Sequence, residues 1–187
     1  MPNLIAHYAC GKLVQKKLNN TSKDFLTGCV LPDYIENSHF RIQGKNFLIP
    51  DIERFLEETN ISNNDLMQGY LTHLLLDKYF LEEYVLENIY DKIDENDNIF
   101  EKDKIYLDYT IISPELLEHF DISLEELKDI LPNNNPNINI DKYKETIKEI
   151  ITNKETKTKY LNPNSFISFI EETSERIVKN HLLPSTR

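Results

Sequence analysis

The sequence predicts an all-α protein, folded as a single-domain multi-helix bundle or orthogonal array. Apolar residues recur at helical spacing along most of the 187-residue chain, and candidate helix caps precede several of these segments. No stretch alternates apolar and polar side chains convincingly enough to predict a strand. A hydrophobic fraction of 40% and a charged fraction of 28% are ordinary for a globular domain. A chain of this length buries enough surface to fold without disulfides.

Four helices are expected in the first half of the chain, over residues 4–18, 24–30, 50–58 and 63–90. Pro2 suits the first turn of the first helix, and Ser22 and Ser62 are candidate N-caps of the second and the fourth. Pro32 should end the second helix, because the residue before a proline avoids the helical region. Residues 33–49 look irregular. The fourth helix is unusually long, so we expect it to be central or kinked.

The second half is expected to contain further helices over residues 100–110, 114–120, 123–131, 141–152 and 165–182. Ser123 is the candidate N-cap of the third of these. Polar residues 91–98 should form a connection, and the Asn- and Pro-rich stretch 131–140 a loop. We therefore expect residues 1–187 to form one domain, in which 1–90 is a metal-binding helical core and 91–187 adds further helices.

The charge balance and the absence of apolar runs disfavour several functions. With 32 acidic and 21 basic residues the formal charge is −11, which disfavours nucleic-acid binding and docking on anionic membranes. No run approaches the roughly 20 apolar residues of a membrane span, and the N-terminal residues do not resemble a secretory signal. We expect a soluble cytoplasmic protein without integral membrane association. Cys10 and Cys29 should be buried structural residues, although thiolates can also bind zinc.

His73 and Asp77 are the strongest candidate ligands. They lie four residues apart in a helix that is apolar nearly all round, so both side chains should be buried on one face. A buried carboxylate must be paired or must coordinate a cation. An imidazole and a carboxylate one turn apart can reach the same divalent ion, such as zinc. The alternative is that the two side chains hydrogen-bond to each other, or that one of them is half-exposed.

Three further residues can join this pair. His7 lies on the first, apolar helix, and Asp33 and His39 follow the short helix that Pro32 ends. Together the five residues form a nitrogen and oxygen ligand set typical of one or two divalent cations. The alternatives are a core histidine satisfied by a backbone carbonyl, a turn-capping aspartate and a surface histidine.

Two glycines add a supporting observation. Gly11 and Gly69 each lie one turn from a candidate histidine, within predicted helices. Because glycine destabilises a helix interior, they can mark close backbone approach beside the site, or they can be incidental.

With these residues in place, the sequence resembles the zinc-dependent phospholipase C family, whose all-helical fold is shared with single-strand-specific nucleases. The resemblance covers about residues 1–85 and rests on the segments MPNLIAHY, GCVLPD with SHF, and GYLTHLLLDKYF. It implies that Asp33, His39, His73 and Asp77 hold one metal ion, and that Asp77 also faces a second ion bound by His7. The implied cofactor is one or two divalent metal ions, and zinc is the metal that the resemblance implies.

The resemblance also has departures. The family usually places another histidine six residues after the helical aspartate, where this chain has Glu83. Neither His119 nor His181 is followed four residues later by a carboxylate, as a further family motif requires. We expect the family's third metal site to be missing or rebuilt, and both histidines to lie at the surface.

The resulting hypothesis is a metal-dependent hydrolase of phosphate esters, acting on a small phosphodiester or phosphomonoester. Asp33 is the candidate catalytic residue, because it can orient or deprotonate a water molecule if one of its oxygens stays free. The alternative is a non-catalytic helical protein with a structural metal site or a buried polar cluster. A nucleotide phosphohydrolase of the His-Asp superfamily ranks lower, since no histidine here is directly followed by an aspartate.

Overall fold

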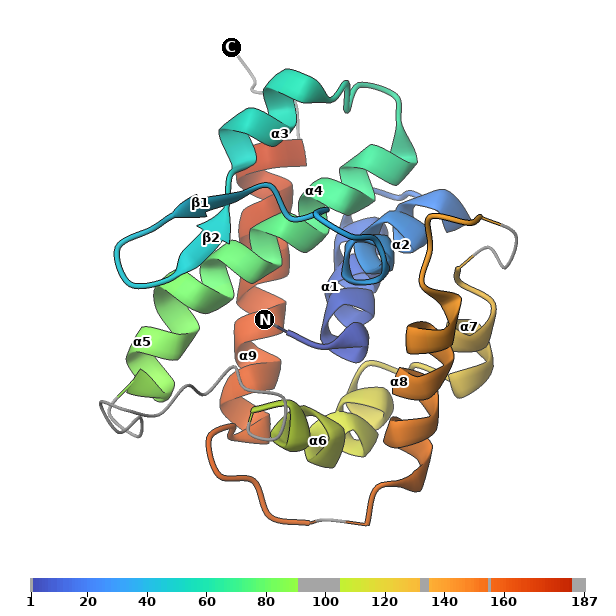
Figure 1. Ribbon diagram of the computed structural model, residues 1–187, viewed down its shortest axis with the longest axis vertical. Coiled ribbons are helices and arrows are strands. Elements are labelled where there is room, and N and C mark those ends of the chain that lie inside the picture. The colour runs from blue at the N-terminus through green and yellow to red at the C-terminus, as the bar shows by residue number, and fades with distance from the viewer. Residues whose placement is uncertain (1, 91–104, 132–134, 155, 183–187) are drawn as a thin grey trace.

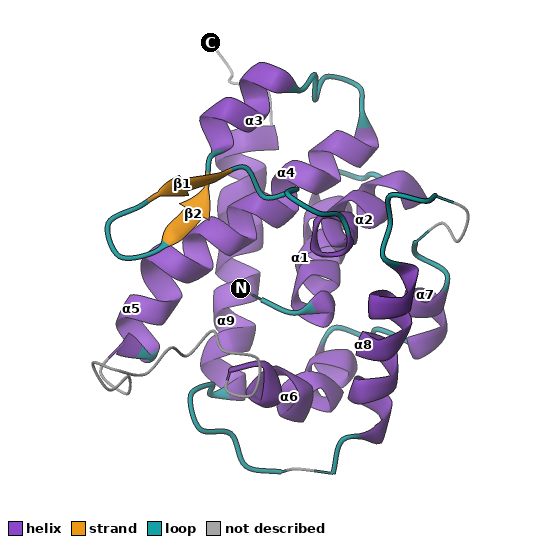
Figure 2. Ribbon diagram, in the orientation of Figure 1, coloured by secondary structure: helices purple, strands orange, loops and turns teal. Residues whose placement is uncertain are grey.

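The computed structural model describes residues 2–90, 105–131, 135–154 and 156–182, and this part of the chain is all-α apart from one small hairpin (Figures 1 and 2). The elements, in chain order, are α1 (Leu4–Lys17), α2 (Lys23–Val30), the 3₁₀ turn η1 (Leu31–Tyr34), β1 (Arg41–Gln43), β2 (Leu48–Pro50), α3 (Ile52–Glu58), α4 (Asp65–Tyr79), the π-helical turn η2 (Phe80–Tyr84), α5 (Val85–Asn88), α6 (Ile105–His119), α7 (Leu124–Lys128), α8 (Ile140–Thr152), α9 (Pro163–Ile177) and the π-helical turn η4 (Val178–Leu182).

The centre of the fold is formed by α1, α2, α4 and α9. Figure 1 shows α4 crossing the molecule between the hairpin and α9, and both α1 and α2 pack against it. Leu74, Leu75 and Leu76 are consecutive in α4 and all are buried, so this helix is covered on every side. A helix that is apolar all round takes such a position. The two central helices α1 and α4 carry three of the five candidate ligands.

Two glycines allow α2 and α4 to cross at close backbone distance. A Cβ atom on Gly28 would collide with the carbonyl of Leu66, and one on Gly69 with the carbonyl of Phe25. The expectation that Gly69 marks close approach is confirmed. At Gly11, a Cβ atom would lie 2.7 Å from Sγ of Cys29, so α1 also lies close to α2. The crossing brings the backbone of α2 beside the polar residues of α4.

The C-terminal half adds α6, α7 and α8 on the other side of α1. The backbone N–H of Asn139, at the start of α8, donates to the carbonyl of Tyr34 over 2.8 Å. Lys142, on the first turn of α8, donates to the carbonyl of Asp33 over 2.8 Å, and its Nζ lies 5.5 Å from the centre of the Tyr34 ring. The turn η1 is therefore held between α2 and α8.

A buried carboxylate joins α6 to the segment before α9. Asp108 is 2% exposed and accepts hydrogen bonds from the backbone N–H groups of Lys159, Tyr160 and Leu161 over 2.5–3.0 Å. These bonds orient the chain as it enters α9, and α9 packs against α1 and α4.

Two predictions about elements were wrong. The helices expected over 100–110 and 114–120 form one helix within the described residues, α6, which continues through Pro114. Ile105, Tyr109, Ile112 and Leu116 bury one face across the proline, and this packing outweighs the lost backbone hydrogen bond. Residues 100–104, and the polar connection at 91–98, lie outside the described residues.

The second wrong prediction was the absence of strands. β1 and β2 form an antiparallel hairpin in which Ile42 pairs with Ile49. Three-residue strands are too short to produce a detectable alternation. The remaining expected helices are present with end residues that differ slightly, and the long segment 63–90 is divided into α4, η2 and α5. None of the helices in the described ranges has the length and apolarity needed to cross a membrane.

Candidate metal centre

The structure brings all five predicted ligand residues together. His7 comes from α1, Asp33 from η1, His39 from the loop after η1, and His73 and Asp77 from one face of α4. Their nitrogen and oxygen atoms form two overlapping groups, His7 with His73 and Asp77, and Asp33 with His39 and His73, within which all atoms lie within 4.8 Å of one another. Residues as far as 70 positions apart in the sequence thus lie together in one site.

The protonation of His73 is determined by the α2 backbone. Nδ1 of this buried imidazole lies 2.8 Å from the carbonyl oxygen of Cys29, which can only accept a hydrogen bond. Nδ1 therefore carries a proton, and in the neutral imidazole the Nε2 lone pair is free. A histidine that binds a metal through one nitrogen usually donates its other N–H to such a partner.

Ser38 determines the protonation of His39 in a similar way. The Ser38 hydroxyl donates its single proton to the carbonyl of Pro32, so it must accept from Nδ1 of His39, which lies 3.0 Å away. The Nε2 lone pair of His39 is then also free. The loop that carries both residues is anchored by Tyr70, whose hydroxyl donates to the carbonyl of Ser38 over 2.6 Å.

The two free lone pairs face each other. Nε2 of His39 and Nε2 of His73 lie 3.3 Å apart. When both protons are on Nδ1, two acceptors at this distance repel, so a cation or an additional proton must lie between them. This arrangement is the central observation about the site.

One oxygen of each aspartate completes a four-atom group. Oδ1 of Asp33 lies 3.5 Å from Nε2 of His39 and 3.9 Å from Nε2 of His73. Oδ2 of Asp77 lies 3.6 Å and 3.5 Å from the same two nitrogens. A tetrahedral ion with bonds of about 2.0–2.2 Å separates its ligands by about 3.3–3.6 Å. The group therefore has the donor set and nearly the spacing of a zinc site.

His7 faces the other oxygens of the same aspartates. Its Nε2 lies 3.3 Å from Oδ1 of Asp77 and 3.9 Å from Oδ2 of Asp33, and its ring stacks on His73 with centroids 3.6 Å apart. Within the described chain, neither nitrogen of His7 and neither oxygen of Asp77 has a hydrogen-bond partner, although all four atoms are buried. His7 is therefore not a core histidine satisfied by a backbone carbonyl, and His73 and Asp77 do not hydrogen-bond to each other.

Such orphaned buried atoms are costly unless something else satisfies them. Both carboxyl groups carry charge. Burial would raise the pKa of Asp77, but the neighbouring imidazoles of His73 and His7 hold it well below its usual value. Burial likewise opposes ionisation of Asp33, yet the adjacent His39 imidazole and the charges of His73 and His7 lower its pKa to about 2.

The histidines differ from each other. Burial and the charge of His73 lower the pKa of His7, whereas the pKa of His73 is raised because the two carboxylates outweigh its burial. With neutral imidazoles the cluster carries two negative charges, the complement of one divalent cation.

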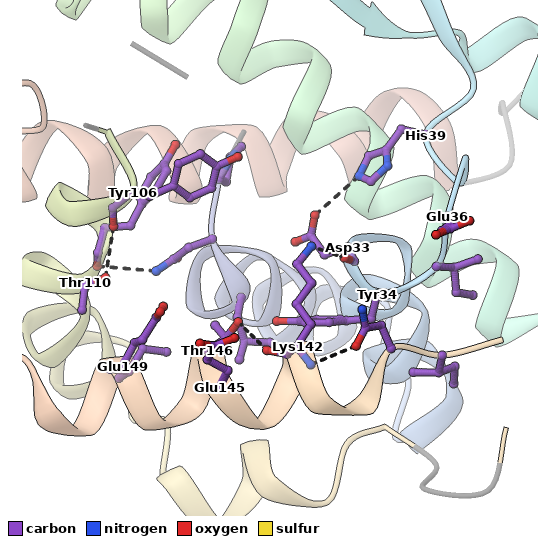
Figure 3. A pocket seen from close by; sticks show the side chains of 18 of the residues that line it. Asp33, Tyr34, Glu36, His39, Tyr106, Thr110, Lys142, Glu145, Thr146 and Glu149 are labelled. Carbon is purple, nitrogen blue, oxygen red and sulfur yellow. Dashed lines mark hydrogen bonds and ion pairs between the residues drawn. The ribbon is translucent and has the colours of Figure 1, made fainter. Parts of the chain in front are cut away.

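The cluster opens onto a cleft of about 1740 Å³, lined among others by Asp33, His39, Tyr106, Tyr109 and Lys142. Figure 3 shows Asp33 and His39 pointing toward each other at one end of this cleft, with Tyr106 and Thr110 of α6 at the other. The Asp33 side chain is 20% exposed, whereas that of Asp77 is fully buried. Asp33 is therefore the carboxylate that a molecule in the cleft can reach.

The remaining candidates lie elsewhere. Glu83 forms a two-pronged ion pair with Arg176, with N–O distances of 2.5 and 2.9 Å. His119 is exposed and pairs with Glu171 over 2.9 Å. His181, expected at the surface, is half-buried and contacts the Tyr79 hydroxyl at 3.2 Å. Cys10 and Cys29 are buried, as expected, and Cys29 contributes only its carbonyl to the site.

Sequence reasoning missed the residues that orient the ligands. Ser38 directly precedes a candidate histidine, so a histidine with an adjacent hydroxyl was an available signal. Lys142 contacts Asp33 from more than 100 residues away, and no local pattern indicates this. Comparison with known proteins adds no relative: no family model, no curated protein and no solved structure matches this chain significantly.

Proposed function

We propose that this chain is a metal-dependent hydrolase of phosphate esters, resembling zinc-dependent phospholipase C. The observation that best supports this proposal is that the Nε2 atoms of His39 and His73 lie 3.3 Å apart, with their lone pairs facing each other. Two ionised carboxylates flank them. This donor set suits zinc and other borderline divalent ions. One ion fits between these four residues, and His7 offers a nitrogen for a second.

The chemistry follows from the donors and from their access to the cleft. These residues would hold a divalent ion, which when bound would supply polarisation of a phosphoryl oxygen and a lower pKa for a water molecule. Asp33 lies at the cleft end of the cluster, where its carboxylate can orient a water molecule or take its proton. Asp77 and His73, which are fully buried, would hold the ion in place. Ser38 and the Cys29 carbonyl keep the histidines in the tautomer that binds.

The cleft and the charge of the chain favour a small substrate. The formal charge of −11 repels long anionic polymers and anionic lipid surfaces. A single phosphodiester or phosphomonoester presents less charge and fits the cleft volume.

The first test is the metal content of the purified protein, followed by assays with bis(p-nitrophenyl) phosphate and p-nitrophenyl phosphate. We expect stoichiometric zinc and hydrolysis that a chelator abolishes. Asp33→Asn should lower kcat at least 100-fold while the circular dichroism spectrum is unchanged. Asp24→Asn, on the exposed side of α2, is the matched control and should leave kcat as it is. Protein without stoichiometric divalent metal, and insensitive to chelator, would disprove the proposal.

The second candidate is a non-catalytic protein in which a metal ion fixes the helix packing. The four-atom group of His39, His73, Asp33 and Asp77 favours it, because closed four-donor sites are typical of structural zinc. Stoichiometric zinc together with no hydrolysis of either ester, and a His73→Ala variant that no longer folds, would favour this function over the hydrolase.

A further inference from the structure

Among the described residues, the buried side-chain nitrogen and oxygen atoms that lack a hydrogen-bond partner belong to His7, Asp77 and Tyr109. The first two are candidate metal ligands. Tyr109 lies on α6 and is 1% exposed, and its orphaned atom is the hydroxyl oxygen. A buried hydroxyl without a partner lowers the stability of the fold, and it calls for an explanation by a ligand or a function.

Packing places Tyr109 next to the elements that carry the other two residues. Its carbonyl accepts a long hydrogen bond, 3.5 Å, from Asn3, the residue that caps α1 one turn before His7. Its ring contacts Phe80, with centroids 6.2 Å apart, and Phe80 follows Asp77 by one turn of helix. Tyr109 therefore packs against residues of the two segments that carry His7 and Asp77, and it lines the same cleft as Asp33 and His39.

The hydroxyl is a donor rather than a phenolate. Burial, the neighbouring Tyr106 and the negative charge of Asp77 raise the pKa of Tyr109 well above its ordinary value, with smaller contributions from Tyr84 and Asp33. The phenol therefore keeps its proton at neutral pH, within the electrostatic range of both carboxylates. Its O–H group, which has no acceptor among the described residues, is available to a ligand.

We propose that the Tyr109 hydroxyl donates a hydrogen bond to a phosphoryl oxygen of the substrate held at the metal cluster, which makes it a substrate-binding residue. This inference rests on the proposed function. A phosphate group is rich in acceptors, and a hydrogen bond to a charged oxygen is stronger than one to a neutral group. A donor that is already positioned and needs no reorganisation serves binding and the transition state alike.

The test compares Tyr109→Phe with Tyr84→Phe in zinc-loaded protein, using inorganic phosphate as the probe in isothermal titration calorimetry. Tyr84 belongs to the same aromatic cluster, but its hydroxyl already pairs with Ser165 over 2.9 Å. We expect Tyr109→Phe to weaken phosphate binding by about 10- to 100-fold and to keep the zinc stoichiometry. Tyr84→Phe should leave phosphate affinity unchanged.

A stability measurement separates ligand binding from a structural role. Metal-free Tyr109→Phe should unfold at the same urea concentration as the wild type or a higher one, because its hydroxyl has no partner to lose. A lower midpoint would reveal a structural partner and overturn the inference.

Three other results overturn it in distinguishable ways. Phosphate affinity within twofold of the wild type would remove Tyr109 from the binding site and leave the proposed function standing. Loss of zinc from Tyr109→Phe would make the residue a metal ligand instead. A wild-type protein that binds neither zinc nor phosphate would end both this inference and the proposed function.

Discussion

Nε2 of His39 faces Nε2 of His73 across 3.3 Å, although the hydrogen bonds on the other side of each ring place both protons on Nδ1. Two lone pairs are thus held against each other by Ser38 and by the α2 backbone. An unrestrained imidazole would rotate or change tautomer to avoid this contact.

Ser38→Ala should weaken zinc binding by about 10- to 100-fold, because the outer hydrogen bond orients the ligand and determines its tautomer. Competition against a chromophoric chelator measures the affinity. Ser165→Ala, which removes a serine hydroxyl bonded to Tyr84 away from the cluster, is the control. Equal zinc affinity for Ser38→Ala and wild type would show that the hydroxyl does not orient His39.

Zinc should raise the melting temperature of the protein. Free ligand at 100 times its dissociation constant adds about 2.7 kcal/mol to the free energy of unfolding. In a protein of this size that corresponds to about 5–10 °C. Differential scanning calorimetry with and without chelator measures the shift. His73→Ala should abolish the shift, while His119→Ala, on an exposed ion pair, should retain it. A zinc-independent melting temperature would argue against the site.

Gly28→Ala and Gly69→Ala should each destabilise the protein by about 3 kcal/mol or more, because the new methyl group meets backbone carbonyls across the α2–α4 crossing. Helix propensity alone predicts the opposite sign, a gain of about 1 kcal/mol. Gly11→Ala should cost less, because the nearest obstacle is the Cys29 thiol, a side chain that can move. Urea unfolding ranks the three, and stabilised Gly28 and Gly69 variants would contradict the crossing.

Asp108→Ala should lower the free energy of unfolding by about 3 kcal/mol, because it leaves the backbone N–H groups of residues 159–161 without their acceptor. Asp108→Asn keeps one acceptor oxygen and should cost less. Zinc stoichiometry should stay at the wild-type value in both variants, since Asp108 is not in the cluster. If Asp108→Ala were as stable as the wild type, the hydrogen bonds between Asp108 and residues 159–161 would contribute nothing to the free energy of unfolding.

The two cysteines should be unreactive in the folded protein. Burial raises the pKa of the Cys10 thiol to about 12, and burial together with Cys10 raises that of Cys29. Neither should react with Ellman's reagent at pH 8 until the chain is unfolded in guanidinium chloride. Rapid labelling of the folded protein would contradict the burial of these thiols.

The raised pKa of the Cys10 thiol also makes the stability of the protein depend on pH. An unfolded thiol ionises near its ordinary pKa of 9.0, whereas the folded one does not ionise until about 12. The contribution of Cys10 is therefore fully present below pH 9 and is lost as the pH rises towards 12. Cys10→Ser should flatten the decline of stability over this range, which unfolding midpoints at pH 8, 9 and 10 can measure.

Local patterns in the sequence account for most of the helices. The apolar periodicity predicts α1, α3 and α8 with nearly correct ends, and Ser123 forms the expected cap, a capping box with Glu126. These features depend on neighbours within about four residues, so they can be read from the chain. The hairpin at 41–50 and the continuation of α6 through Pro114 depend on packing against distant elements, so they could not be read from it.

The sequence by itself determined which chemical groups are available: three histidines and two aspartates, on or beside helices that are apolar enough to be buried. Only the tertiary structure decided that His7, His39 and His73 meet the same two carboxylates, which ring nitrogens are free, and that the buried Tyr109 hydroxyl has no hydrogen-bond partner among the described residues. The physical reason is distance along the chain. Helical periodicity places a side chain on a face, whereas convergence depends on how α1, α2, α4 and α6 cross, which the packing of their buried surfaces sets.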